Sequence, residues 1–153
     1  MCLIIDANVV SLVFAADPEE DWAPIGRALR ERKARAVYGG KLREEYSKLA
    51  RLRPLIEELD RQGALRKVSD AAVEVETQVV EKEAVGVSDD PHIIALARVA
   101  RVRLLCSNDQ DLHQDFTNPE LLQPHGSVYQ SKRHVHLIRR HCKGMGARSS
   151  KRS

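Results

Sequence analysis

Acidic side chains that could hold a metal ion stand at four well-separated points of the chain: Asp6, Glu45, Asp90 and Asp109. Carboxylates brought close together repel one another, which raises their pKa values and destabilises the fold unless a cation compensates. A ligand set made of oxygen atoms alone suits Mg²⁺ or Mn²⁺. Such ions activate a water molecule and neutralise charge on a phosphodiester and its leaving oxygen. If the fold gathers these acids, the sequence predicts phosphodiester hydrolysis.

Two of these acids follow short apolar runs that are typical of buried strands. Asp6 comes directly after residues 3–5, and Asp109 follows residues 102–106 after a tight turn. Apolar runs separated by helices indicate βαβ units and a mostly parallel sheet. Reactive groups in such sheets gather beyond the carboxyl ends of the strands, so Asp6 and Asp109 are expected at the same edge.

The glutamate has two candidates, Glu44 and Glu45, on a helix expected over residues 41–53. At about 100° per residue, the apolar face of this helix centres near Leu42, with Glu45 about 60° away and Glu44 about 160° away. Glu45 is therefore predicted to face the other acids and Glu44 to face solvent.

The remaining acid, Asp90, precedes Pro91 at the start of a helix. An Asp at this position is also a good N-cap in any protein, and Asp109 is also an ordinary turn former. Neither residue by itself indicates a metal site. His92, in the first turn of the same helix, is interpreted as packing at the helix start rather than as a contact to substrate phosphate. Other acids are expected to be solvated: Glu44, Asp89 and Asp115.

Hydrophobic periodicity, together with residues typical of helix starts and turns, predicts the remaining helices and strands. Helices are expected to begin at 17–20, 41, 54, 69 and 88–91, and strands to cover 3–5, 36–38 and 102–106. Because 153 residues suffice for one compact domain, an α/β domain is expected over 1–124. Residues 125–153 are expected to be a basic extension, with one added strand within 127–138 and disorder from Cys142 onward.

Charge is distributed unevenly along the chain. Residues 121–153 contain eight Lys or Arg and no Asp or Glu, so the first 120 residues hold 17 basic and 22 acidic side chains. The protein is thus an acidic body with a basic end, which excludes a uniformly basic nucleic-acid binder. Aromatic residues are only 4%, too few to favour a base-stacking sheet surface.

Cysteine use and hydropathy limit the cellular setting. The three cysteines are an odd number with no C-x-x-C spacing, which predicts neither a disulfide framework nor a cysteine zinc site and fits a cytoplasmic location. The longest uncharged stretch in the apolar N-terminal region is 7–16, shorter than the roughly 20 residues of a membrane-spanning helix. No membrane association is expected.

Taken in chain order, the acids resemble those of the PIN-domain nucleases. The segments that carry the resemblance read LIIDANVV at 3–10, LREEY at 42–46, DDPHIIALA at 89–97 and LCSNDQDL at 105–112. The likeness covers about residues 1–116. The chain departs from the family pattern at the glutamate, which follows Gly39-Gly40 and is doubled, and in the basic extension after Pro124.

This resemblance implies a three-layer α/β/α fold with a mostly parallel central sheet and a Mg²⁺- or Mn²⁺-dependent endoribonuclease activity. It assigns both catalysis and metal binding to the same acids: Asp6, Glu45, Asp90 and Asp109. It adds Asp111 as a further metal-binding acid and Asn8 as a polar group at the substrate, orienting Asp6. Many small bacterial members are toxins of toxin–antitoxin pairs, so the implied partners are RNA, an antitoxin or other regulatory protein, and a second copy in a homodimer.

The basic extension leaves alternatives open. Its side chains are candidates for sequence-independent, salt-sensitive contacts to RNA phosphates, chiefly through Lys132, Arg133, Arg139 and Arg140. The same residues also fit a solubilising terminus or a docking segment for an acidic partner. The alternative function is therefore a non-catalytic PIN-like module that binds nucleic acid or protein through this extension. A phosphotransfer enzyme of another α/β family is disfavoured because position 8 is Asn, where a dehalogenase-type phosphatase needs Asp.

Overall fold

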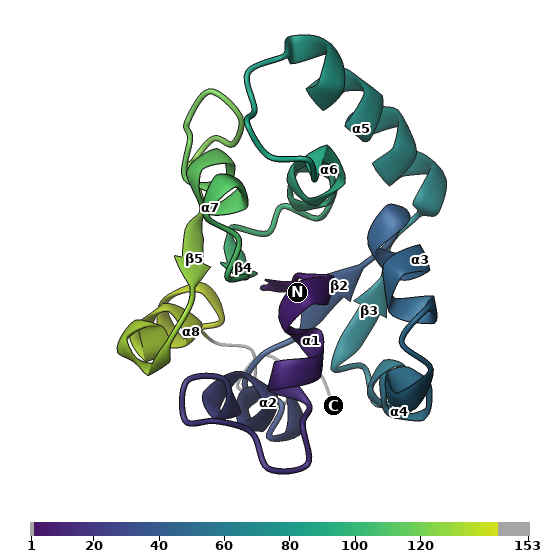
Figure 1. Ribbon diagram of the computed structural model, residues 1–153, viewed down its shortest axis with the longest axis vertical. Coiled ribbons are helices and arrows are strands. Elements are labelled where there is room, and N and C mark those ends of the chain that lie inside the picture. The colour runs from purple at the N-terminus through teal and green to yellow at the C-terminus, as the bar shows by residue number, and fades with distance from the viewer. Residues whose placement is uncertain (1, 144–153) are drawn as a thin grey trace.

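The computed structural model describes residues 2–143, in which short strands alternate with helices (Figure 1). The strands are β1 (Ile4–Ile5), β2 (Ala36–Tyr38), β3 (Leu65–Lys67), β4 (Leu104–Cys106) and β5 (Ser127–Tyr129). The helices are α1 (Ala7–Val13), α2 (Ala23–Arg30), α3 (Lys41–Ser47), α4 (Arg53–Arg61), α5 (Asp70–Glu83), α6 (Pro91–Ala100), α7 (Gln110–Phe116) and α8 (Val135–His141). The α/β class predicted from the sequence is confirmed.

All the strand pairings of these residues are parallel. β4 lies between β1 and β5, with Ile4 opposite Leu105 and Leu105 opposite Val128, and β2 pairs with β3. A parallel bridge between Leu3 and Ala36 connects the two groups, which gives the order β3-β2-β1-β4-β5. Figure 1 shows α3 and α4 beside β2 and β3, and α7 and α8 beside β4 and β5. Because the strands run in the same direction, the residues after β1, β4 and β5 leave the sheet at one edge.

The core forms where apolar strands meet a helix that is apolar over most of its surface. β1 and β4 are fully buried, and residues 93–97 of α6 are buried as a continuous run. α5 packs against α6 and buries Val73 and Val80, as its amphipathic sequence predicts. Within residues 2–143, no helix combines the length and the apolar character needed to cross a membrane.

Several predicted boundaries differ from the structure. The helix expected to enter at 17–20 begins later, at Ala23, where Pro24 occupies the first turn and Ile25 and Leu29 face the core. The helix expected over 41–53 ends at Ser47, and a short 3-10 helix precedes α4. β3 has no sequence signal, because only its first residue is buried and the other two are charged and exposed.

The segment after Pro124 contributes to the core. β5 lies within the stretch 127–138 where one strand was predicted, but the rest of that stretch contains a 3-10 helix (Lys132–His134) and the first residues of α8. Leu137 and Ile138 of α8 are buried, and α8 contacts α2, β4 and β5. The disorder predicted from Cys142 onward falls mostly on residues 144–153, which lie outside the described residues.

Cys142 is buried and forms a disulfide with Cys2, next to β1. The prediction that the cysteines form no disulfide is therefore wrong. A separation of 140 residues leaves no spacing pattern in the sequence. The pairing arises because the sheet places β1, β4 and β5 side by side and α8 packs beside β4 and β5.

Candidate metal centre

The acids predicted from the sequence come from four separate segments at the same edge of the sheet. Asp6 directly follows β1 and is the N-cap residue of α1, while Asp109 follows β4 and is the N-cap residue of α7. The pairing of β1 with β4 brings these two loops together. α3 supplies Glu45, and the start of α6 supplies Asp90.

Asp6 is the most buried of these acids, with 5% of its surface exposed. The hydroxyl of Ser107 donates a hydrogen bond of 2.9 Å to Asp6 Oδ2, and the same oxygen atom of Ser107 accepts a bond of 3.1 Å from the backbone N–H of Asp109. Burial raises the pKa of Asp6 to about 6. The hydrogen bond from Ser107 opposes this shift, whereas the charges of Asp90 and Glu45 add to it.

Helix α3 is held against β1 by a buried tyrosine. The hydroxyl of Tyr46 donates a hydrogen bond to the backbone oxygen of Ile5, which immediately precedes Asp6. The neighbouring Glu45 is half-buried and directed toward Asp90 and His92, whereas Glu44 is exposed. This is the arrangement that the helical-face argument predicted for the two glutamates.

The start of α3 depends on the backbone freedom of glycine. Gly40 precedes the helix with φ of +60°, and a Cβ atom at this position would lie 2.7 Å from a methyl carbon of Val73 in α5. Its N–H donates a 2.8 Å hydrogen bond to Asp70 Oδ1 of α5. The glycine pair that departs from the PIN pattern thus sets where the helix carrying Glu45 begins.

Asp90 is the N-cap residue of α6, but its side chain makes no capping hydrogen bond. The carboxylate is therefore available for another role, unlike that of an ordinary N-cap. Burial raises the pKa of Asp90; the neighbouring His92 opposes the shift, and the charges of Glu45 and Asp109 add to it. Asp90 thus interacts electrostatically with each of the other three predicted acids, and Asp6 interacts with Glu45 as well.

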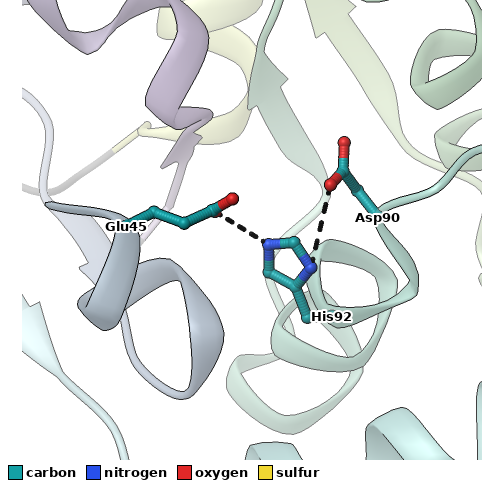
Figure 2. A group of neighbouring side chains, drawn as sticks. All are labelled: Glu45, Asp90 and His92. Atoms are coloured by element: carbon teal, nitrogen blue, oxygen red, sulfur yellow. Dashed lines mark hydrogen bonds and ion pairs between the residues drawn. The ribbon is translucent and has the colours of Figure 1, made fainter. Parts of the chain in front are cut away.

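His92 lies between two of the acids, as Figure 2 shows. Its Nε2 is 3.0 Å from Glu45 Oε1, and its Nδ1 is 4.0 Å from Asp90 Oδ1. The side chain is 3% exposed, and Nδ1 has no hydrogen-bond partner among residues 2–143. Burial lowers the pKa of His92, although the charge of Glu45 opposes this shift, so the neutral ring is favoured.

One oxygen of Asp109 has a structural role. Its Oδ1 accepts hydrogen bonds from the backbone N–H groups of Asp111 and Leu112, which caps α7. The other oxygen of Asp109 makes no hydrogen bond to the described residues. Asp111 is exposed in the first turn of α7.

The predicted substrate-binding residues lie on exposed positions. Asn8 is exposed in α1, and within residues 2–143 it is Ser107, not the Asn8 side chain, that donates a side-chain hydrogen bond to Asp6. Lys132 forms an ion pair of 2.6 Å with Glu20. Further exposed cations follow β5. Arg133 is in the 3-10 helix directly after this strand, whereas Arg139 and Arg140 are near the end of α8, where Cys142 is bonded to Cys2 ahead of β1, so they lie toward the opposite edge of the sheet from the acids.

Sequence reasoning missed several residues that shape this centre. Asp115, expected to be solvated, is 3% exposed and accepts hydrogen bonds from the backbone N–H groups of Val87 and Ser88. The Ser88 hydroxyl oxygen accepts one from the N–H of Asp90, so Asp115 fixes the loop that delivers Asp90. Ser107, interpreted as a turn former, orients Asp6. Its position directly after an apolar strand was the only available signal.

A cavity of about 640 Å³ adjoins the centre between α3, α5 and the start of α6. His92 and Asp115 contribute to its lining, together with the exposed acids Glu44 and Asp89. The four predicted acids are not among the lining residues. His92, which lines the cavity and contacts Glu45, is the residue that connects the cavity to the acids.

The donor atoms fit a divalent cation. One ligand atom each from Glu45, Asp90 and His92 can be chosen so that all three lie within 4.8 Å of one another. Asp6 and Asp109 lie outside this tightest group but interact electrostatically with Asp90. Among residues 2–143, no Lys or Arg forms an ion pair with any of the four acids.

No protein-family model matches the chain, and no curated protein or solved structure shows significant similarity to it.

Proposed function

We propose that this protein is a Mg²⁺- or Mn²⁺-dependent endoribonuclease of the PIN type, which hydrolyses RNA phosphodiester bonds. The observation that carries the proposal is the convergence of Asp6, Glu45, Asp90 and Asp109 from four segments without a Lys or Arg partner within residues 2–143. Such a cluster destabilises the fold unless a cation compensates its charge. Its position beyond the carboxyl ends of parallel strands is typical of α/β active sites.

When bound, a divalent cation supplies an activated water molecule and offsets charge on the phosphodiester and its leaving oxygen. The protein's own residues hold and orient the site. Asp6 is fixed by Ser107 and shielded from water by burial. Asp90 is held by the loop that Asp115 organises, and Asp109 keeps one oxygen free while the other caps α7.

RNA is the proposed substrate because exposed cations follow β5: Arg133 lies just past the edge where the acids gather, and Arg139 and Arg140 lie further along α8. Arg133, Arg139 and Arg140 are exposed and form no ion pair within residues 2–143. Contacts from these side chains to phosphates would offset repulsion between RNA and the acidic body. Lys132 contributes less to this surface, because Glu20 partly neutralises its charge.

The remaining features of the proposal follow from the PIN resemblance. They are the three-layer α/β/α arrangement, a homodimer, and a toxin role with an antitoxin or other regulatory protein as partner. The acidic centre supports this last point, since a cationic side chain of a partner placed among these carboxylates would compete with a metal ion. The cytoplasmic location was predicted from cysteine use, and the disulfide between Cys2 and Cys142 removes that support.

The second candidate, a non-catalytic binding module, is favoured by the exposed arginines of α8. It predicts that RNA binding survives Asp6→Asn and fails when Arg139 and Arg140 are replaced by Gln. The nuclease proposal predicts that cleavage fails with Asp6→Asn.

The direct test is cleavage of RNA by the purified protein in Mn²⁺, with matched variants of the doubled glutamate. Asp6→Asn and Glu45→Gln should each reduce the cleavage rate by about a hundredfold or more, because each removes a metal-site carboxylate. Glu44→Gln, at the exposed neighbouring position, should cleave at nearly the wild-type rate. Equal cleavage by wild type and Asp6→Asn would reject the proposal, since the activity would then come from a different site or a contaminant.

A further inference from the structure

Within residues 2–143, three histidines have a buried ring nitrogen without a hydrogen-bond partner: His92, His113 and His141. His92 is the most buried of the three, with 3% of its side chain exposed, and its unpartnered atom is Nδ1. Buried polar atoms are nearly always hydrogen-bonded, and an exception calls for an explanation such as an ion or a catalytic role. Figure 2 shows this nitrogen on the side of the ring that faces Asp90.

The tautomer of the ring follows from its other contact. Nε2 lies 3.0 Å from Glu45 Oε1, and a carboxylate oxygen accepts hydrogen bonds, so Nε2 carries the proton and donates. The neutral ring then has a lone pair on Nδ1. Asp90 Oδ1 is 4.0 Å from this nitrogen. Two electron-rich atoms this close in a buried place are stabilised when a cation binds to both.

We propose that His92 Nδ1 and Asp90 Oδ1 together bind a divalent cation, and that this nitrogen ligand makes the site prefer Mn²⁺ over Mg²⁺. The inference rests on the proposed metal-dependent function but does not require RNA cleavage. Imidazole nitrogen is a suitable ligand for transition metals, whereas Mg²⁺ favours oxygen atoms and water.

The separation of the two atoms allows a shared ion. A metal ion about 2.1–2.2 Å from each ligand atom would span about 4 Å at a wide ligand–metal–ligand angle. The contact to Glu45 completes a familiar arrangement, because a metal-binding histidine usually donates its other N–H to a carboxylate, which fixes the ring and its tautomer. In this arrangement Glu45 Oε1 orients the imidazole, and only Oε2 of Glu45 remains for the metal ion.

The test is pulsed electron paramagnetic resonance of the full-length protein loaded with Mn²⁺, without RNA. A directly bound imidazole produces nitrogen modulation of the Mn²⁺ signal, and that modulation changes when the protein is labelled with ¹⁵N-histidine. We expect this signal in the wild type, its loss in His92→Gln, and its retention in His136→Gln, which alters an exposed histidine of α8. A titration should show Mn²⁺ affinity about tenfold lower in His92→Gln, with a smaller change for Mg²⁺.

The outcomes separate this inference from the proposed function. Mn²⁺ bound to the wild type without histidine modulation would overturn the role of His92 and leave the carboxylate site intact; this readout needs no variant to fold. A nitrogen signal that persists in His92→Gln would also overturn it. Failure of the wild type to bind Mn²⁺ at all would reject both this inference and the metal site on which the nuclease proposal depends.

Discussion

The two ends of α6 gather carboxylates in opposite ways. Near its C-terminal end, Arg98 forms ion pairs of 2.9 Å with Glu76 and 2.8 Å with Glu83, and it donates a further hydrogen bond to the backbone oxygen of Leu121. At its N-terminal end, Asp90 lies near three further acids, and no Lys or Arg within residues 2–143 pairs with them. The same helix therefore carries one neutralised set of acids and one that is not.

The pKa shifts of Glu83 at one end of α6 and of Asp6 and Asp90 at the other have opposite signs. The hydrogen bond from Arg98 lowers the pKa of Glu83, so its ionised form stabilises the fold. Burial raises the pKa of Asp90, and raises that of Asp6 to about 6, so their ionised forms cost stability. A set that stabilises the fold needs no other explanation. A set that destabilises it is what a functional site is expected to show.

The largest effect on stability should come from removing the buried negative charge of Asp6. Asp6→Asn should raise the free energy of unfolding of the metal-free protein by up to about 3 kcal/mol at pH 8, because a pKa raised by about two units costs about 1.4 kcal/mol per unit. Denaturant unfolding in the presence of a chelator measures this change. Asp89→Asn, at an exposed position, should leave the unfolding free energy nearly unchanged.

The same variant should change the pH dependence of stability. The folded-state pKa of Asp6, about 6, lies above its value of 3.8 in the unfolded chain, so the folded state binds the proton more tightly. The contribution of Asp6 to stability therefore falls as the pH rises from about 4 to above 6. Asp6→Asn should lose this part of the pH dependence. Equal curves for the variant and the wild type between pH 4 and 8 would contradict the burial argument.

A smaller effect of opposite sign is expected at the other end of α6. Arg98→Met should lower the free energy of unfolding by about 1–2 kcal/mol, because Glu76 and Glu83 lose their partner and Leu121 loses a donor. Thermal and denaturant unfolding at pH 7 measure the loss. Lys132→Met, which removes an exposed ion pair with Glu20, is the matched control and should have little effect. If Lys132→Met destabilised the protein as much as Arg98→Met, the ion pairs of Arg98 would contribute no more than an exposed surface pair, which would contradict this account.

Local patterns predicted the parts of this molecule that are set by neighbours in sequence. Short apolar runs predicted β1 and β4, and the helical period predicted that Glu45 rather than Glu44 faces Asp90 and His92. The Ser-Asp-Asp-Pro segment predicted the start of α6. It did not predict that the side chain of the N-cap residue Asp90 makes no capping hydrogen bond. Each of these features depends on fewer than about ten consecutive residues.

Features that depend on distant segments were not predictable in the same way. Asp115 is buried because the backbone of Val87 and Ser88 approaches it from 28 and 27 residues away. Cys2 and Cys142 meet only after the sheet and α8 are assembled. The unpartnered Nδ1 of His92 likewise depends on Glu45 in another helix, since the sequence gives no sign of which ring nitrogen is satisfied.

The central claim is that the unneutralised acids at the start of α6 form a cation site. Isothermal titration of Mn²⁺ into the wild type and into the neighbouring variants Asp90→Asn and Asp89→Asn tests it most directly. Asp90→Asn should weaken binding by about ten- to a hundredfold, whereas Asp89→Asn, with the same change of charge at an exposed position, should bind like the wild type. Equal affinities for the wild type and both variants would contradict the claim.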